Sequence, residues 1–326
     1  MTGVIVRAAA HRAVDRHFTA AILDPVESVG SAEITPAVVG AIVDWYGTNR
    51  RDLAFRRTSD PYAILVSEVI AQQTQAERAA ARWERFMARF PTVDALAAAS
   101  PADVLREWQG LGYDRRALNL WRAARVIRDE QGGRVPRAVD DLDALPGIGA
   151  YTARAIAAIA FGEPVGAVDV NVRRVLGRIV RGADGVASRD VQAEADRAAA
   201  LTDPATWTHA VMDLGATVCR PRNPTCERCP VRASCRYAVS VPAGRQATVA
   251  QRRPSAAFPS TNRWLRGRIL DRLRAAPDGS WVAFDGPIGS HGTARVQEAA
   301  RALAADGLVE LHEPSPTDVE ARLAVA

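Results

Sequence analysis

All four cysteines of the chain lie in one short stretch, where Cys219, Cys226, Cys229 and Cys235 follow the spacing C-x6-C-x2-C-x5-C. A secreted domain held by disulfides spreads its cysteines along the chain, so this clustering favours a metal site in a reducing cytoplasm. Four thiolates this close in sequence can complete an all-cysteine site, and either zinc or a [4Fe–4S] cluster would satisfy the geometry. The role expected of such a metal is structural.

A second constraint is the glycine turn that reads LPGIG, from Leu145 to Gly149, and leads into a helix with apolar side chains at helical spacing. Gly147 and Gly149 let this turn place bare backbone N–H groups beside an anion, and the helix N-terminus adds partial positive charge. We therefore expect the turn to hold one phosphate group. About twenty residues later, Asp169 is expected to open another helix, where it could be a plain N-cap, a catalytic carboxylate or both.

Helical periodicity dominates the first 237 residues, and no segment there shows the sustained two-residue alternation of a half-buried strand. Ser59-Asp60 before Pro61 is a good helix start, because it combines a capping side chain with a proline at the first helical position. The fold class predicted for this part is all-α. Further helices are expected at about 36–47, 76–90, 101–109, 115–130, 189–201 and 207–218.

The composition changes after residue 237, and residues 238–261 are predicted to be a linker rich in Pro, Ala, Ser and Arg. Beyond it we expect a helix over 262–275, a strand over 281–284, a helix over 293–306 and a hairpin from 308–311 and 321–326. This order is typical of a winged-helix-like α+β module, although a generic small α+β domain fits about as well. The predicted domains are an extension (1–34), a helical domain (35–237), the linker and the module (262–326).

Glu68 lies in the helix that begins at Pro61, with apolar neighbours one turn before it and Ala71 and Gln72 one turn after it. Burial on such a face raises the pKa of a carboxyl group, which suits a general acid. The alternative is a glutamate that pairs with an arginine on the helix surface. Tyr113, at the exit of the turn Gly110–Tyr113, could in the same way simply fill a core.

Every one of the 42 basic residues is arginine, the net charge is +5 and the sequence pI is about 9.4. Arginine makes bidentate contacts with phosphates, so a nucleic-acid partner is plausible, but a GC-rich genome would also produce this bias. Arg220, Arg222 and Arg232 surround the cysteine loop and suggest that it meets phosphate. No apolar run approaches membrane-spanning length.

The chain resembles the helix–hairpin–helix DNA glycosylase superfamily over roughly residues 35–237. Three features together carry this resemblance: the glycine turn, the aspartate about twenty residues on, and the cysteine spacing. The stretch Ser67–Gln75, which reads SEVIAQQTQ, is similar to the catalytic helix of A/G-specific adenine glycosylases of the MutY type. Gly110–Tyr113 and Met212–Ala216 also match that type. The resemblance implies a two-lobed fold, a [4Fe–4S] cluster on the four cysteines, double-stranded DNA as the partner, a monomer and base excision repair.

The resemblance also assigns roles to individual residues. Glu68 would protonate a flipped-out adenine and Asp169 would stabilise the sugar cation that forms when the N-glycosidic bond breaks. Tyr151 and Asn171 would line the sugar pocket. On the DNA side, Gln73 would fill the gap left by flipping and Tyr113 would wedge the duplex. The expected DNA contacts are completed by Gly147, Gly149, Arg56, Arg220 and Arg222.

Three features depart from the family pattern. The usual LPWR reads Leu53-Ala54-Phe55-Arg56, and Asp114 replaces a second tyrosine after Tyr113. A short module stands where the family carries a Nudix-like domain that senses 8-oxoguanine. Where related endonucleases carry a catalytic lysine the chain has Tyr151, and it contains no lysine at all, so a lysine-based lyase is excluded.

Two rival interpretations remain. The first is a pyrimidine glycosylase of the same superfamily that acts on G·T or G·U mismatches, which would share Tyr151 and Asp169 but not the QQTQ pattern of residues 72–75. The second is a non-catalytic DNA-binding regulator, which could use the helical turn, the cysteine loop and a winged helix. Two carboxylates at matching positions favour an enzyme that excises adenine.

Overall fold

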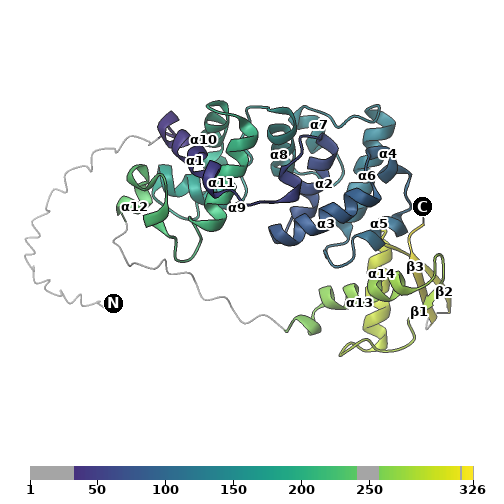
Figure 1. Cartoon of the computed structure of the whole chain (residues 1–326). Coiled ribbons are helices and arrows are strands. Elements are labelled where there is room, and N and C mark those ends of the chain that lie inside the picture. Colours follow the sequence, from purple (N-terminus) through teal and green to yellow (C-terminus); the bar gives the residue numbers. More distant parts are fainter. Residues whose placement is uncertain (1–32, 241–256, 316–317, 326) are drawn as a thin grey trace, which may run out of the picture.

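The computed structural model describes residues 33–240, 257–315 and 318–325 of the chain. The predicted extension and linker therefore lie mostly outside the described residues. Helices make up residues 33–240, as expected, and no strand lies among them. None of the described helices is both long and apolar enough to span a membrane. Figure 1 shows two helical lobes side by side, with a smaller mixed unit below one of them.

The first lobe joins the beginning of the helical region to its end. Its core contains Ile42 of the first helix together with Leu176, Trp207 and Leu214 from far along the chain. Ile34 is also buried here and donates its N–H to Glu194 Oε2 at 3.0 Å, so the packed chain already begins inside the predicted extension. The elements are α1 (Pro36–Asn49), α9 (Val170–Leu176), η2 (Gly177–Arg181), α10 (Ser188–Ala200), α11 (Pro204–Thr217), η3 (Cys226–Arg228), η4 (Arg232–Ser234) and α12 (Arg236–Ser240).

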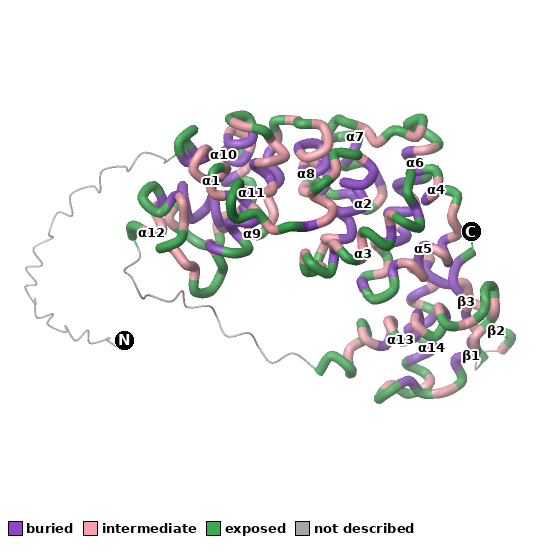
Figure 2. The backbone as a smooth tube through the Cα atoms, in the orientation of Figure 1, coloured by how far each residue is buried: buried purple, intermediate pink, exposed green. Residues whose placement is uncertain are grey.

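The second lobe is a bundle of helices around a core that includes Phe86, Trp108 and Ile156. Its helices surround α2, whose residues 62–67 are all buried (Figure 2). Asp60 caps α2 by accepting the Tyr62 N–H at 3.1 Å, and Pro61 occupies the first turn, as the sequence predicted. The elements are η1 (Ala54–Arg56), α2 (Pro61–Ala71), α3 (Ala76–Arg89), α4 (Val93–Ala98), α5 (Pro101–Glu107), α6 (Arg115–Glu130), α7 (Val139–Asp143) and α8 (Ala150–Phe161).

The C-terminal unit is a small α+β module with a three-stranded antiparallel sheet in the order β1-β3-β2. The predicted hairpin is present: Val309 pairs with Leu323, and Leu311 pairs with Ala321. The strand expected at 281–284 is shorter and pairs Val282 with Ala321. The elements are η5 (Phe258–Ser260), α13 (Asn262–Ala275), β1 (Val282–Ala283), α14 (Thr293–Ala305), β2 (Val309–Ser315) and β3 (Asp318–Leu323).

The module packs on the second lobe rather than standing apart from it. Leu265, Ile269 and Leu273 of α13 belong to the same apolar core as Leu105 and Trp108. Arg274, near the end of α13, pairs with Asp114 and donates from Nε to the Leu105 carbonyl oxygen at 2.9 Å. The charge of Asp114 therefore faces the module, which accounts for a carboxylate beside the expected wedge Tyr113.

We predict that Asp114→Asn destabilises the protein by about 2 kcal/mol, because the buried Arg274 loses one of its two carboxylate partners and keeps only Asp271. The two side chains are only 13% and 5% exposed. Urea unfolding would measure the change in the free energy of unfolding. Asp52→Asn is the matched control, since Asp52 pairs with Arg57 at the surface and its loss should leave stability unchanged. Equal effects of the two substitutions would contradict this account of how the module is held.

Candidate active site

Glu68 and Asp169, which are about a hundred residues apart in the chain, line one pocket of about 560 Å³. Glu68 comes from the buried helix α2 of the second lobe, and Asp169 precedes α9 of the first lobe. The remaining lining comes from the end of α2 and the start of α8: Ala71, Gln72, Gln73, Gly149, Ala150, Tyr151 and Thr152. The two carboxylates that the sequence singled out therefore reach a common space.

Burial of Glu68 raises the pKa of its carboxyl group from 4.5 to about 7. Desolvation is the largest cause, the positive charge of Arg56 opposes it, and the negative charge of Asp169 adds to it. A carboxyl group with a pKa near neutrality is protonated in a large fraction of molecules and can still lose its proton. It is therefore suited to general acid catalysis.

Asp169 is an N-cap and a pocket residue at once. Its Oδ1 accepts the backbone N–H groups of Asn171 and Val172 at 2.8 and 2.7 Å, while its Oδ2 accepts the Asn171 side-chain amide at 2.9 Å. These three donors hold the carboxylate in one orientation at the edge of the pocket. The two interpretations left open by the sequence are thus compatible.

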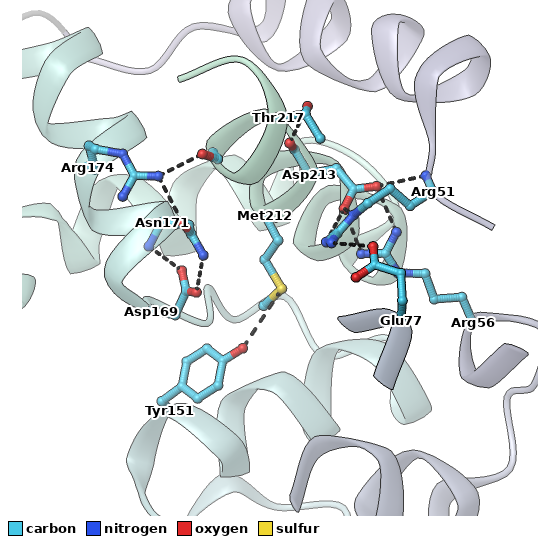
Figure 3. Close-up of polar contacts among 11 residues, drawn as sticks. Arg51, Arg56, Glu77, Tyr151, Asp169, Asn171, Arg174, Met212, Asp213 and Thr217 are labelled. Carbon is cyan, nitrogen blue, oxygen red and sulfur yellow. Dashed lines mark hydrogen bonds and ion pairs between the residues drawn. The ribbon is translucent and has the colours of Figure 1, made fainter. Parts of the chain in front are cut away.

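Arg174 contacts Asn171, which in turn contacts Asp169 (Figure 3), and Arg174 also reaches the backbone of Cys219. One of its terminal nitrogens donates to Asn171 Oδ1 at 2.8 Å and to the Gly215 carbonyl oxygen at 2.7 Å, and Nε donates to the Cys219 carbonyl oxygen at 2.6 Å. The orientation of Asp169 therefore depends, through Asn171 and Arg174, on where the cysteine loop begins. No motif in the sequence predicts this role for Arg174.

Tyr151 lies in the first turn of α8 and donates its hydroxyl to Met212 Sδ at 3.8 Å. Burial, with added repulsion from the charges of Glu68 and Asp169, raises the pKa of this phenol well above 10. The side chain is therefore a neutral hydroxyl beside both carboxylates. It offers hydrogen bonding, but no amine that could attack a sugar.

Arg56 was expected to contact DNA, but its guanidinium is committed inside the protein. It makes two hydrogen bonds to Asp213 of α11, at 2.7 and 2.9 Å, and its side chain is only 8% exposed. Arg51 donates to the same carboxylate, and the arginines hold the pKa of Asp213 below its ordinary value although burial opposes this. We therefore assign Arg56 to the junction of the two lobes. The sequence contains one sign of this junction: Asp213 is the only charged residue in the stretch Met212–Ala216, so a buried partner could be expected for it.

The glycine turn has the conformation that its sequence predicts. Gly147 has a φ of +78°, and a Cβ there would lie 2.6 Å from Asn119 Cβ, so no other residue fits without distortion. Gly149 is the N-cap of α8 and gives it no side-chain cap. The first N–H groups of α8 are thus left to solvent or to an anion at the pocket entrance.

Gln73 and Tyr113, the residues expected to enter the duplex, both have left-handed backbone conformations, with φ of 54° and 49°. Arg116 links their two segments, because it donates to the carbonyl oxygens of Val69, Ile70 and Gln72 and to those of Leu111 and Gly112. Strained backbone that the surroundings hold in place often marks a functional site. Arg116 belongs to no recognisable motif, so its role could not be predicted from the sequence.

The four cysteines lie at the end of the first lobe, where α12 and two short helical turns follow α11, and Cys219, Cys229 and Cys235 pack against its core. Arg178 donates from Nη1 to Cys219 Sγ at 3.4 Å, and burial raises the pKa of the Cys229 thiol to about 11. Among the described residues, no group of three or more His, Cys, Asp or Glu is arranged to hold a single metal ion. Arg220 and Arg222 are exposed on this loop, as a DNA contact would require.

Comparison with known proteins places this site in a family. The model of the HhH-GPD superfamily of base excision DNA repair proteins matches residues 66–199. An adenine DNA glycosylase of Mycolicibacterium smegmatis is 44% identical over 277 residues, which cover 82% of this chain and 91% of that protein. The chain belongs to the adenine DNA glycosylase family. The human adenine DNA glycosylase is 43% identical over 218 residues, or 63% of this chain and 40% of its own length.

Two solved structures show the same fold over the helical region. A thermostable thymine-DNA glycosylase matches with a TM-score of 0.58 and 30% identity, and covers 62% of this chain and 95% of its own. An endonuclease III bound to DNA matches with a TM-score of 0.54 and 22% identity, and covers 63% of this chain and 97% of its own. The two-lobed arrangement is therefore that of the helix–hairpin–helix glycosylases.

We predict that Glu68→Gln stabilises the protein at pH 8 relative to the wild type, by roughly 2–3 kcal/mol more than at pH 4. The raised pKa of Glu68 means that the unfolded chain ionises first as the pH rises from 4.5 to about 7, so wild-type stability falls across this interval. The glutamine variant has no such loss. Thermal unfolding at both pH values measures the difference, and the exposed Glu84→Gln on α3 is the control. A pH-independent difference would contradict the burial of this carboxyl group.

Proposed function

We propose that this protein is a DNA glycosylase of base excision repair that removes adenine mispaired with guanine or 8-oxoguanine. The observation that carries the proposal is the single pocket shared by Glu68, with a pKa of about 7, and Asp169. A flipped-out base can enter such a pocket, whereas the same base is inaccessible inside a duplex. The relatives named adenine DNA glycosylase support adenine as that base.

The reaction begins with a proton transfer. Protonated Glu68 donates to N7 of the flipped adenine, so that the electron pair of the bond between the sugar carbon and N9 can leave with the base. The apolar helix around Glu68 keeps the proton available at neutral pH. The burial that raises its pKa is thus the feature that makes α2 catalytic.

Asp169 acts when the bond breaks. The sugar becomes an oxocarbenium-like cation, and a carboxylate held by three hydrogen bonds at the pocket edge stabilises that charge. Water then attacks the sugar carbon and gives its proton to Glu68, which restores the acid. Tyr151 lines the pocket with the two carboxylates, whereas Asn171 acts from behind Asp169 by holding its carboxylate in place.

Strand cleavage by a lysine Schiff base has no part in this mechanism. The position that would carry the lysine is Tyr151, and the chain contains no lysine. The product is therefore an intact strand with an abasic site, and the enzyme is monofunctional.

For DNA binding, we propose that Gly147, Gly149 and the start of α8 hold a backbone phosphate, while Gln73 and Tyr113 enter the duplex as the adenine leaves it. The exposed Arg220 and Arg222 extend this contact along the cysteine loop. The C-terminal module has the helix, strand, helix and hairpin order of a winged helix. We propose that the protein acts as a monomer.

We propose that Cys219, Cys226, Cys229 and Cys235 hold a [4Fe–4S] cluster, because their spacing resembles the iron–sulfur loop of the helix–hairpin–helix glycosylases. Backbone N–H groups near Cys229 and Cys235, and the guanidinium of Arg178 near Cys219, would stabilise the sulfur charges. Bound there, the group would hold in place the loop whose Cys219 carbonyl oxygen anchors Arg174 of α9, and through it Asn171 and Asp169.

One observation favours a second function. The thymine-DNA glycosylase is 30% identical to this chain and shares its fold, so removal of T or U opposite G is the alternative. Gln72 and Gln73 at the pocket and the adenine-specific relatives favour adenine.

To test this, the protein is incubated with duplexes that contain A opposite 8-oxoguanine, A opposite G, or T or U opposite G. Alkali is added afterwards to break the strand at any abasic site. We expect strand breaks at the adenine only after alkali, and a loss of activity of at least about a hundredfold in Glu68→Gln, as for removal of a general acid. Release of T or U alone would assign the pyrimidine function. Binding without excision on every duplex would indicate a regulator, and unchanged activity of Glu68→Gln would overturn the mechanism.

A further inference from the structure

Four arginines of α3 lie on one side of that helix, outside the pocket of the two carboxylates. At 3.6 residues per turn, their spacing places them within an arc of about 60° around the helix axis. We call this set the α3 stripe: Arg78, Arg82, Arg85 and Arg89. The two glutamates of the helix, Glu77 and Glu84, lie roughly 120° away around the axis. The helix therefore presents its positive charge on a side of its own.

Most of this charge has no acidic partner. Arg85 pairs with Glu107 of α5. Among the residues that the structure describes, no carboxylate lies within ion-pair distance of Arg78, Arg82 or Arg89, and Arg82 makes no hydrogen bond either. Arg78 and Arg89 are exposed and Arg82 is half-buried. Arginines that share one surface without counter-charges attract a polyanion.

The stripe begins beside the two segments that are proposed to enter the duplex. α3 starts three residues after Gln73, at Ala76. Arg78 donates to the carbonyl oxygen of Gly110, and a Cβ on that glycine would lie 2.9 Å from Arg82 Nη2. Both guanidinium groups therefore lie against the turn that carries Tyr113.

The packing of α3 fixes where these charges are. Phe86 is buried in the core of the second lobe, and Trp83 donates from Nε1 to the Ala63 carbonyl oxygen of α2 at 2.9 Å. α2 is the helix that carries Glu68. An anion bound by the α3 stripe would therefore be held at a set place relative to that carboxyl group.

We infer that the α3 stripe binds the phosphate backbone of the duplex next to the flipped base, with Arg82 as its principal contact and Arg78 beside it. The inference rests on the proposed function in one respect: entry of Gln73 and Tyr113 into the duplex brings the start of α3 to the DNA surface. Arginine binds phosphate through a planar fork of donors and reads no base there, so the contact is independent of sequence. The stripe is about 16 Å long, close to the rise of about five base pairs, and can contact more than one phosphate.

An acidic segment of another protein is the rival occupant, because it would carry the same charge as DNA. The position of the stripe beside Gln73 and Tyr113 favours DNA. The two occupants differ in a measurable way, since each phosphate that an arginine neutralises releases counterions and adds about 0.9 to the salt dependence of DNA binding.

The test measures the dissociation constant of a fluorescently labelled duplex across a series of salt concentrations. One duplex is fully paired, and a second carries a tetrahydrofuran abasic analogue opposite guanine, which has no glycosidic bond to hydrolyse. A contact to the phosphate backbone contributes equally to both duplexes, whereas a contact to a base does not.

For Arg82→Gln we expect about tenfold weaker binding to both duplexes and a salt slope that is smaller by about 1. Arg82→Lys keeps the positive charge and should restore the wild-type slope. Arg189→Gln is the matched control, because it removes the same charge from a side chain of α10 that is 88% exposed and lies in the other lobe. Its affinity and slope should equal those of the wild type.

A second variant combines Arg78→Gln with Arg82→Gln, and its slope should be smaller by about 2. Slopes equal to the wild-type value in both variants would overturn the inference and leave the stripe to a protein partner or to solvent. A loss in Arg189→Gln as large as that in Arg82→Gln would also overturn it, since net charge alone would then explain the effect. Absence of any adenine excision would instead defeat the proposed function, and the slope on the fully paired duplex would still decide the role of α3.

Discussion

The pairing of Arg56 with Asp213 is the contact on which the active site depends. Asp213 belongs to the first lobe and Arg56 to the segment that leads into α2, so the bond sets how the lobes meet. The pair also affects the electrostatic environment of Glu68. The positive charge of Arg56 favours ionisation of Glu68, and Asp213 offsets that charge with a carboxylate that is fully buried. Glu68 can therefore keep its proton near neutral pH although an arginine lies in its neighbourhood.

Asp169, the second carboxylate, is held in place by contacts within the first lobe. Asn171 and Arg174 connect Asp169 to the backbone of Cys219, so the end of the first lobe is mechanically part of the site. A structural metal at the cysteine loop would act on catalysis in this way, through orientation and without touching the substrate. The two halves of the reaction thus use different supports. Burial keeps the proton on Glu68, with the charge of Arg56 offset by Asp213, and hydrogen bonds that lead to the cysteine loop orient Asp169.

Local sequence patterns predicted the helices and the apolar face of Glu68 well. The start of α6 at Arg115, the bounds of α13 and the pairing of the last two strands agree with the structure, because capping and periodicity are local properties. The short helix α4 was missed, since six residues do not show a period. Arg56, Asp114 and Arg116 could not be assigned from sequence, because their partners lie far along the chain or are backbone carbonyls. Contacts between residues far apart in the chain produce no recognisable residue spacing in the sequence.

The central claim is that one buried, protonated carboxyl group from α2 delivers the proton that releases adenine. Its most direct test is the pH dependence of the single-turnover excision rate at saturating enzyme. We expect a rate that falls as the pH rises, with an apparent pKa near 7, because Glu68 loses its proton in that range. A rate that stays constant well above pH 8, or one whose alkaline fall persists unchanged in a Glu68→Gln variant that still excises adenine, would contradict it.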